Sequence, residues 1–161
     1  MRGEGEEKVR VVISPYRICP IGAHIDHQGG PTLGMAVSAH SALNYTTAPI
    51  IQLASDNFPG EVVIEWARLG SVDAYDGWGR YVAAAVHALR DRLSGSPAGI
   101  RGRIHGTLPG GGLSSSASVL LAYLTALADV NGIELSPSEL VERSLTAERD
   151  FVGVKVGVLD P

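Results

Sequence analysis

The segment 100–130 constrains the fold more than any other part of the sequence. In it a strand-like run, a glycine-serine stretch and a long apolar run follow one another directly. The run IRGRIHG at 100–106 is typical of a short β-strand. The stretch LPGGGLSSSAS follows at 108–118, and SASVLLAYLTALADV at 116–130 is apolar on nearly every side, which predicts a buried helix. A glycine-rich loop is therefore expected to lead from a strand into a helix of the core.

Such a loop is an arrangement that binds phosphate. Glycines allow close backbone approach and positive φ angles, and the unpaired N–H groups of a first helical turn carry partial positive charge. The hydroxyls of Ser114, Ser115 and Ser116 can cap the helix, contact a phosphate or bind magnesium. The lysine of G-x-x-x-x-G-K-[ST] and the spacing G-x-G-x-x-G are both missing from this stretch. The local pattern therefore leaves a second interpretation open, a plain turn whose serines only cap the helix.

The first part of the chain is rich in β-branched, alternating runs that predict strands. These strands are expected at 8–14, over 32–48 as one or two strands, at 49–56 and at 61–67, with a turn at 57–60. The segment 15–31 between the first two strands holds three prolines and three glycines and is expected to be a long irregular loop. Because it also carries Arg17, His24, Asp26 and His27, we expect this loop to be functional.

Helices dominate the second part of the chain. The spacing of apolar residues over 76–93 predicts an amphipathic helix. Another helix is expected over 136–152, where Ser136, Pro137 and Glu139 form a capping pattern with proline at the first helical position. Strands first and then mixed helix and strand indicate the α+β class.

Composition narrows the functional classes. The 161 residues are about one domain's worth, and 45% hydrophobic with 19% charged residues is typical of a globular protein. A net charge of −4 without a basic tract argues against nucleic acid or an anionic membrane as a partner. The single cysteine, Cys19, fits a cytoplasmic location. The acidic start MRGEGEEK is unlike a secretory signal, and no run of about 18 apolar residues occurs.

Three segments, in order, resemble the GHMP sugar-kinase superfamily and the galactokinases within it. The segment at 14–30 resembles P-G-R-V-N-L-I-G-E-H-T-D-Y-N-G-G, 110–117 resembles G-x-G-L-S-S-S-A, and 147–161 resembles A-E-x-x-F-V-G-x-x-x-G-I-M-D-Q. The matching residues of the first two motifs are Pro15, Arg17, Ile21, Gly22, His24, Asp26, Gly29, Gly30, Gly110, Gly112, Leu113, Ser114, Ser115, Ser116 and Ala117. The resemblance implies the α+β N-terminal domain of these kinases, a mixed sheet covered by helices that is related to the second domain of ribosomal protein S5.

The resemblance also implies transfer of a phosphoryl group from ATP, with Mg²⁺, to a monosaccharide. Asp160 matches the catalytic aspartate that takes or draws the proton of the anomeric hydroxyl, and Arg17 matches the cation beside it. Ser116 and Glu148 match the Mg²⁺ ligands. Without the family, Arg17 and Glu148 are ordinary surface charges. The nucleotide-binding residues implied are Gly110, Gly111, Gly112, Leu113, Ser114, Ser115 and Ser116.

The sugar is expected to contact Ala23, His24, Asp26 and Gly29 by the same resemblance. A carboxylate such as Asp26 can accept two hydroxyl protons from a diol. The residues alone also allow a metal site, because His24 and Asp26 belong to a short H-x-D-H cluster.

One departure from galactokinases bears on the substrate. Ala23 stands where those enzymes carry a glutamate that points at the C6 hydroxyl of galactose. Glutamate would repel a carboxylate at C6, whereas alanine leaves room for it. The segment also resembles plant-type galacturonokinases, including Ala23, His27 and Gln28. We therefore expect D-galacturonate as the substrate and its 1-phosphate as the product, with galactose as the alternative.

The chain stops one residue after Asp160, with Pro161 in place of the family's glutamine. Full-length family members continue into a C-terminal domain with a third glycine-rich motif. Residues 1–161 are therefore expected to be the N-terminal domain alone, with a separate C-terminal domain as a potential partner. Because an aspartate beside a chain end frays easily, the isolated chain is expected to be inactive. A non-catalytic sugar sensor and a fragment without a role of its own remain the alternatives.

Overall fold

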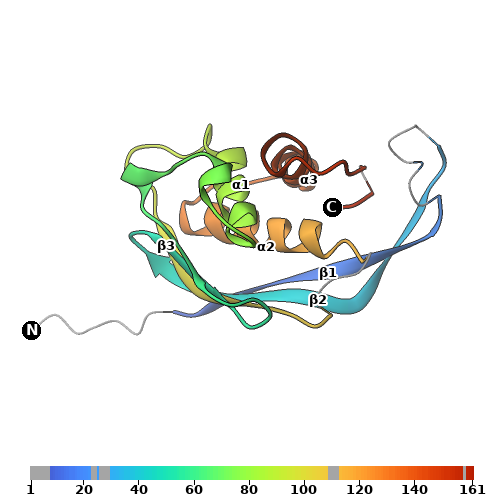
Figure 1. Cartoon of the computed structure of the whole chain (residues 1–161), viewed down its shortest axis with the longest axis horizontal. Helices are drawn as coiled ribbons and strands as arrows, with labels where there is room; N and C mark the ends of the chain where they lie inside the picture. The colour runs from blue at the N-terminus through green and yellow to red at the C-terminus, as the bar shows by residue number, and fades with distance from the viewer. Residues whose placement is uncertain (1–7, 23–24, 26–29, 109–112, 158) are drawn as a thin grey trace, which may run out of the picture.

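The computed structural model describes residues 8–22, 25, 30–108, 113–157 and 159–161. A five-stranded mixed sheet in the order β1-β2-β5-β3-β4 carries the helices on one face (Figure 1). Neighbouring strands are antiparallel except for β3 and β5, which are parallel. The strands are β1 (Arg10–Ile21), β2 (Leu33–Ala48), β3 (Ile51–Ser55), β4 (Glu61–Ile64) and β5 (Gly99–Gly106). The α+β class predicted from the sequence is confirmed.

The helices follow the predicted order with shifted boundaries. They are α1 (Gly79–Leu89), α2 (Ser115–Val130), α3 (Pro137–Thr146) and the π-helical turn η4 (Ala147–Val152), besides two single-turn 3₁₀ segments at 66–68 and 72–74. The capping box at α3 is confirmed, because the Ser136 hydroxyl accepts from the Glu139 N–H and the Glu139 carboxylate accepts from the Ser136 N–H. The single helix expected over 136–152 instead changes to π-helical geometry at Ala147.

The expectation of an irregular loop over 15–31 is wrong in its first part, because β1 continues to Ile21. Strand β1 lies at the edge of the sheet and pairs only with β2, so its two prolines can leave their missing N–H groups on the unpaired side. The pairing shifts register between Pro15 and Arg17 and again between Ile18 and Ile21. The prolines that make this segment look like a loop in the sequence are accommodated by these register shifts, and the long hairpin still forms.

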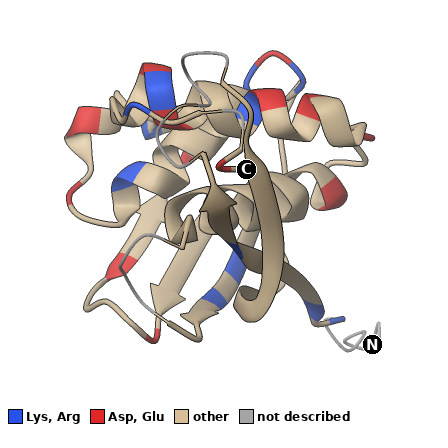
Figure 2. Ribbon diagram, turned by 90° about the vertical axis from the view of Figure 1, so that its right-hand side faces the viewer, with Lys and Arg blue, Asp and Glu red and all other residues tan. Residues whose placement is uncertain are grey.

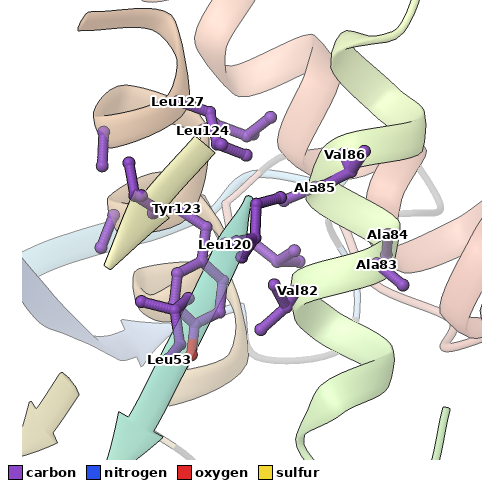
Figure 3. Packing of buried hydrophobic residues seen from close by; sticks show 14 of the residues in the cluster. Leu53, Val82, Ala83, Ala84, Ala85, Val86, Leu120, Tyr123, Leu124 and Leu127 are labelled. Atoms are coloured by element: carbon purple, nitrogen blue, oxygen red, sulfur yellow. The ribbon is translucent and has the colours of Figure 1, made fainter. Parts of the chain in front are cut away.

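The core lies between the sheet and the two central helices. Leu120 and Leu124 of α2 point toward Val82 and Val86 of α1, above Leu53 of β3 (Figure 3). Each of these five side chains is at most 1% exposed, and full burial of such a side chain contributes roughly 1.5–3 kcal/mol. Helix α2 is covered by β1, β2, β5, α1 and α3, which explains why it is apolar on nearly every side.

The chain end returns to the β1–β2 hairpin (Figure 1). A Cβ atom at Gly34 of β2 would come within 2.7 Å of Leu159 Cδ1, so glycine there leaves the space that Leu159 fills. This packing brings residue 160 against β1. Figure 2 shows Lys and Arg interspersed with Asp and Glu over the face seen there. The part of the chain that the structure describes contains no helix with the length and hydrophobicity of a membrane span.

Candidate functional site

Two consecutive residues of β1, Tyr16 and Arg17, lie at a register shift where three residues of β2 stand opposite the single residue between Pro15 and Arg17. Tyr16 is 1% exposed and lines a cavity together with α2, whereas Arg17 reaches Asp160. In a regular strand these neighbours would point to opposite faces. The shift also lets the Arg17 N–H donate to the Leu113 carbonyl at 3.1 Å. A bulge of this kind commonly re-aims side chains beside active sites.

The carboxylate of Asp160 is held by three donors. Arg17 Nη2 and Ser114 Oγ donate to Oδ1 at 2.5 and 2.9 Å, and the Gly157 N–H donates to Oδ2 at 2.9 Å. Arg17 Nε also donates to the Leu159 carbonyl at 2.8 Å. The side chains of Arg17 and Asp160 are 19% and 27% exposed, so the pair stays accessible to a ligand. The structure thus brings together the expected catalytic pair and the expected nucleotide loop.

The glycine-serine loop enters α2 through a left-handed residue. Ser114 has φ 54° and ψ 38°, and it is the only non-glycine residue with positive φ in the described part of the chain. Its carbonyl accepts from the Ser118 N–H, so the helix begins directly after it. Ser115 and Ser116 follow in the first turn and line the same cavity as Tyr16.

Glu148 lies in η4 and is completely buried. Neither carboxylate oxygen has a hydrogen-bond partner within the part of the chain that the structure describes. Burial raises the pKa of Glu148 above its usual range, and the charge of Asp160 adds to the rise, while the Ser116 hydroxyl and Arg149 oppose it. A buried, unpartnered carboxylate is costly, and such groups usually coordinate a cation or pair with one. Carboxylate and hydroxyl oxygens suit magnesium, so Glu148 and Ser116 fit the expected metal site.

An apolar cavity of about 350 Å³ opens beside the first turn of α2. Its walls include the aromatic side chains of Tyr16, Phe58, Trp78, Tyr81 and Tyr123. Burial raises the pKa of Tyr81, and the charge of Glu148 adds to that rise, so this wall of the cavity adjoins the buried carboxylate. The volume lies within the range of small-molecule sites.

Sequence reasoning missed this cavity. Trp78 and Tyr81 belong to DGWGRY, whose pattern predicts only the start of an amphipathic helix, and Phe58 belongs to the predicted turn at 57–60. Phe58 and Trp78 share one signal, an aromatic residue beside glycine or proline just outside a regular element, whereas Tyr81 lies inside α1. That signal is too common to separate a ligand wall from ordinary core packing, and only the tertiary structure brings the three aromatics together.

Several expected site residues lie outside the described residues. They are Ala23, His24, Asp26 and Gly29 of the expected sugar site and Gly110, Gly111 and Gly112 of the expected nucleotide loop. The alternative metal cluster around His24 lies there too. Among the expected site residues that are described, Arg17, Leu113, Ser114 and Asp160 are linked by hydrogen bonds.

Comparison with known proteins identifies relatives along nearly the whole chain. The chain is 36% identical to galacturonokinase of Arabidopsis thaliana over 182 residues, covering 99% of the chain and 42% of the relative. It is 35% identical to galactokinase of Thermococcus kodakarensis over 150 residues, covering 92% of the chain and 42% of the relative. The chain therefore spans less than half the length of these curated relatives.

Solved structures show the same fold. Lactococcus lactis galactokinase complexed with galactose superposes with a TM-score of 0.86 at 29% identity, over 96% of this chain and 41% of that one. Methanococcus jannaschii mevalonate kinase superposes with a TM-score of 0.82 at 19% identity, over 96% of this chain and 50% of that one, which shows a shared fold.

The family model described as "GHMP kinases N terminal domain" matches residues 80–161, just over half of the chain. The match includes the glycine-serine loop, Glu148 and Asp160. The chain therefore belongs to the GHMP kinase family.

Proposed function

We propose that this protein takes part in ATP-dependent phosphorylation of a monosaccharide at its anomeric hydroxyl, with D-galacturonate as the preferred substrate. One observation carries the proposal: Asp160 is bonded both to Arg17 and to Ser114 of the glycine-serine loop. An acceptor-activating carboxylate, a cation and a phosphate-type loop therefore meet at one point. Phosphoryl transfer needs mainly this kind of positioning and charge stabilisation.

The aromatic cavity supports a nucleoside triphosphate as the phosphoryl donor. Ser115 and Ser116 line its end, so a base in the cavity has its phosphates directed to the first turn of α2. Trp78 and Tyr81 offer flat apolar surfaces on which a base can stack. ATP is the donor that this arrangement and the family favour.

Glu148 and Ser116 are the residues that would hold Mg²⁺. Glu148 brings two buried oxygens without a partner among the described residues, which is a suitable donor set for a hard cation. When bound, the ion supplies neutralisation of phosphate charge.

Asp160 would receive the acceptor hydroxyl. A carboxylate offers about four lone-pair positions, and Arg17, Ser114 and Gly157 use three of them. Counting donors from the described residues, one position remains for the hydroxyl proton of a sugar. Arg17 keeps a positive charge beside the oxygen as that proton leaves, which stabilises the developing oxyanion.

The substrate assignment depends on the sugar loop. Ala23, His24, Asp26 and Gly29 remain the proposed sugar-binding residues, and the missing glutamate at Ala23 favours an acid at C6. The relatives support a sugar substrate, since they include both a galacturonokinase and galactokinases. Galactose is the second candidate.

The domain organisation is also a proposal. We infer that residues 1–161 form the N-terminal domain of a kinase, since the chain spans 42% of each of the two curated relatives described above. A C-terminal domain would complete the enzyme, and the isolated chain would bind ligands with little or no turnover.

Calorimetry and a coupled ADP-release assay test these proposals. Mg-ATP, galacturonate and galactose are titrated into the 161-residue chain, and turnover is measured with this chain and with the whole gene product. We expect Mg-ATP to bind the chain, and the whole gene product to phosphorylate galacturonate faster than galactose. Binding of sugar by the whole gene product without turnover would favour the non-catalytic sensor, and faster use of galactose would refute the uronate assignment.

A further inference from the structure

Ser114 combines two features that each cost stability. Its backbone is left-handed, with φ 54°, which an L-residue adopts at a cost that glycine does not have. It also occupies the N-cap position of α2 without making a side-chain capping bond, although serine is a favoured N-cap because its oxygen accepts from the first-turn N–H groups. Local strain of this kind is retained where the geometry serves a function.

The hydroxyl that does not cap α2 is directed to Asp160 instead. Ser114 Oγ donates to Oδ1 of Asp160 at 2.9 Å, across 46 positions of sequence. The preceding carbonyl, that of Leu113, accepts from the Arg17 N–H at 3.1 Å. The loop is therefore attached to β1 through its backbone and to Asp160 through its side chain.

These bonds determine the orientation of the carboxylate. Arg17 and Ser114 both donate to Oδ1, and the Gly157 N–H donates to Oδ2. Arg17 reaches Asp160 from a flexible side chain, whereas Ser114 has a short side chain on a helix that is anchored in the core. Ser114 is therefore the donor that fixes the position of the Asp160 carboxylate relative to helix α2.

We propose that Ser114 is a positioning residue whose left-handed backbone directs its hydroxyl to Asp160 and fixes that carboxylate relative to the nucleotide loop. The proposal rests on the proposed function and deepens it. Ser114 acts through Asp160 rather than on the reacting atoms. Its role is to hold the acceptor-activating carboxylate of Asp160 at a fixed position relative to the phosphate loop.

Two substitutions distinguish the effect of the Ser114 hydroxyl from the effect of its left-handed backbone. Ser114→Gly removes the hydroxyl and relieves the left-handed strain, whereas Ser114→Ala removes the hydroxyl and keeps the strain. The unfolding midpoint of the glycine variant should exceed that of the alanine variant by about 2–4 °C. Ser118→Ala is the matched control, because the Ser118 hydroxyl donates within the core to the Ser14 carbonyl at 2.7 Å.

The first readout requires no turnover. Hydrogen exchange of the Gly157 amide, which donates to Asp160 Oδ2, is followed by NMR in the ligand-free 161-residue chain. Exchange should be faster in both Ser114 variants and unchanged in Ser118→Ala. Equal Gly157 exchange in the wild type and Ser114→Gly would overturn the proposal, whatever the chain catalyses.

The second readout applies to the whole gene product. Loss of a hydrogen bond to a charged group should lower kcat about 10- to 100-fold in both Ser114 variants, with KM for ATP and sugar within about threefold of the wild type. Unchanged kcat in Ser114→Gly would overturn the proposal. A wild type that transfers no phosphoryl group would refute the proposed function, and the Gly157 exchange would still decide whether Ser114 holds Asp160.

Discussion

The guanidinium of Arg17 lies 2.5 Å from the carboxylate of Asp160, although 143 positions separate the two residues in sequence. A second nitrogen of the same guanidinium bonds the Leu159 carbonyl at 2.8 Å. Arg17 thus contacts both the side chain of Asp160 and the backbone just before it. This relationship joins the edge strand β1 to the chain end and creates the point at which loop, cation and carboxylate meet.

Replacement of Arg17 by lysine tests that relationship. Lysine keeps the positive charge but lacks the rigid planar fork through which two arginine nitrogens bond the carboxylate and the carbonyl in fixed directions. We expect Arg17→Lys to lower the rate of sugar phosphorylation by the whole gene product about 100-fold. Arg143→Lys is the matched control, since Arg143 forms a two-pronged contact with Asp91 instead of with Asp160. Equal activity of the two variants would contradict the assignment of Arg17.

Replacement of Glu148 by glutamine should stabilise the ligand-free chain at neutral and higher pH. Burial raises the pKa of Glu148 in the folded state above the ordinary value of 4.5. As the pH rises from about that value toward the folded pKa, the unfolded chain releases this proton first, so the wild type loses stability over that window. Glu148→Gln cannot ionise and avoids this loss. Chemical unfolding should show about 1–3 kcal/mol more stability for the variant at pH 8 and almost no difference at pH 4.

Magnesium should stabilise the wild type more than the Glu148→Gln variant. We expect added Mg²⁺ to raise the unfolding midpoint of the wild type and to leave that of Glu148→Gln nearly unchanged, since the variant has lost the charged ligand. Thermal unfolding with and without Mg²⁺ measures this directly. An equal Mg²⁺ response of both proteins would show that the ion binds elsewhere.

The two tryptophans can report on the aromatic cavity. Trp78 lines the cavity, whereas Trp66 bonds the Pro49 carbonyl and is not among the cavity residues. ATP should change the fluorescence of Trp66→Phe, in which Trp78 remains, and should leave that of Trp78→Phe nearly constant. We also expect Trp78→Ala to weaken ATP binding about 10- to 100-fold, the usual cost of losing one base-stacking contact. A signal that follows Trp66 would place the nucleotide elsewhere.

Two buried serines, one that lines the cavity and one that does not, provide a matched pair. Ser41 and Ser144 are completely buried, and neither hydroxyl has a partner among the described residues. Only Ser41 lines the cavity. Both Ser→Ala changes should raise the free energy of unfolding by about 1 kcal/mol, because each removes an unsatisfied polar group.

Nucleotide affinity should separate the two variants. If the Ser41 hydroxyl bonds the base, Ser41→Ala weakens ATP binding about tenfold, and Ser144→Ala leaves it unchanged. Calorimetry measures both affinities. Unchanged ATP binding by Ser41→Ala would exclude that hydroxyl from base recognition.

The sequence by itself determined the class of the fold and the order of its main elements. Period-two alternation and the all-round apolar run at 116–130 placed the strands and α2 in the right order, although β1 continues to Ile21 beyond its expected end. The capping box at Ser136 was readable because its bonds form within one helical turn. These features depend on neighbours in sequence, so local patterns are enough to predict them.

Only the tertiary structure decided what depends on distant contacts. Strand β1 continues past Pro15 and Pro20 because β2 pairs with it at positions from Arg10 to Ile21. Ser114 donates to Asp160 instead of capping its helix. The tertiary structure also buried Glu148 and assembled the cavity from Tyr16, Trp78 and Tyr81. A residue's exposure and partners are set by segments far away in sequence, and no local pattern contains that information.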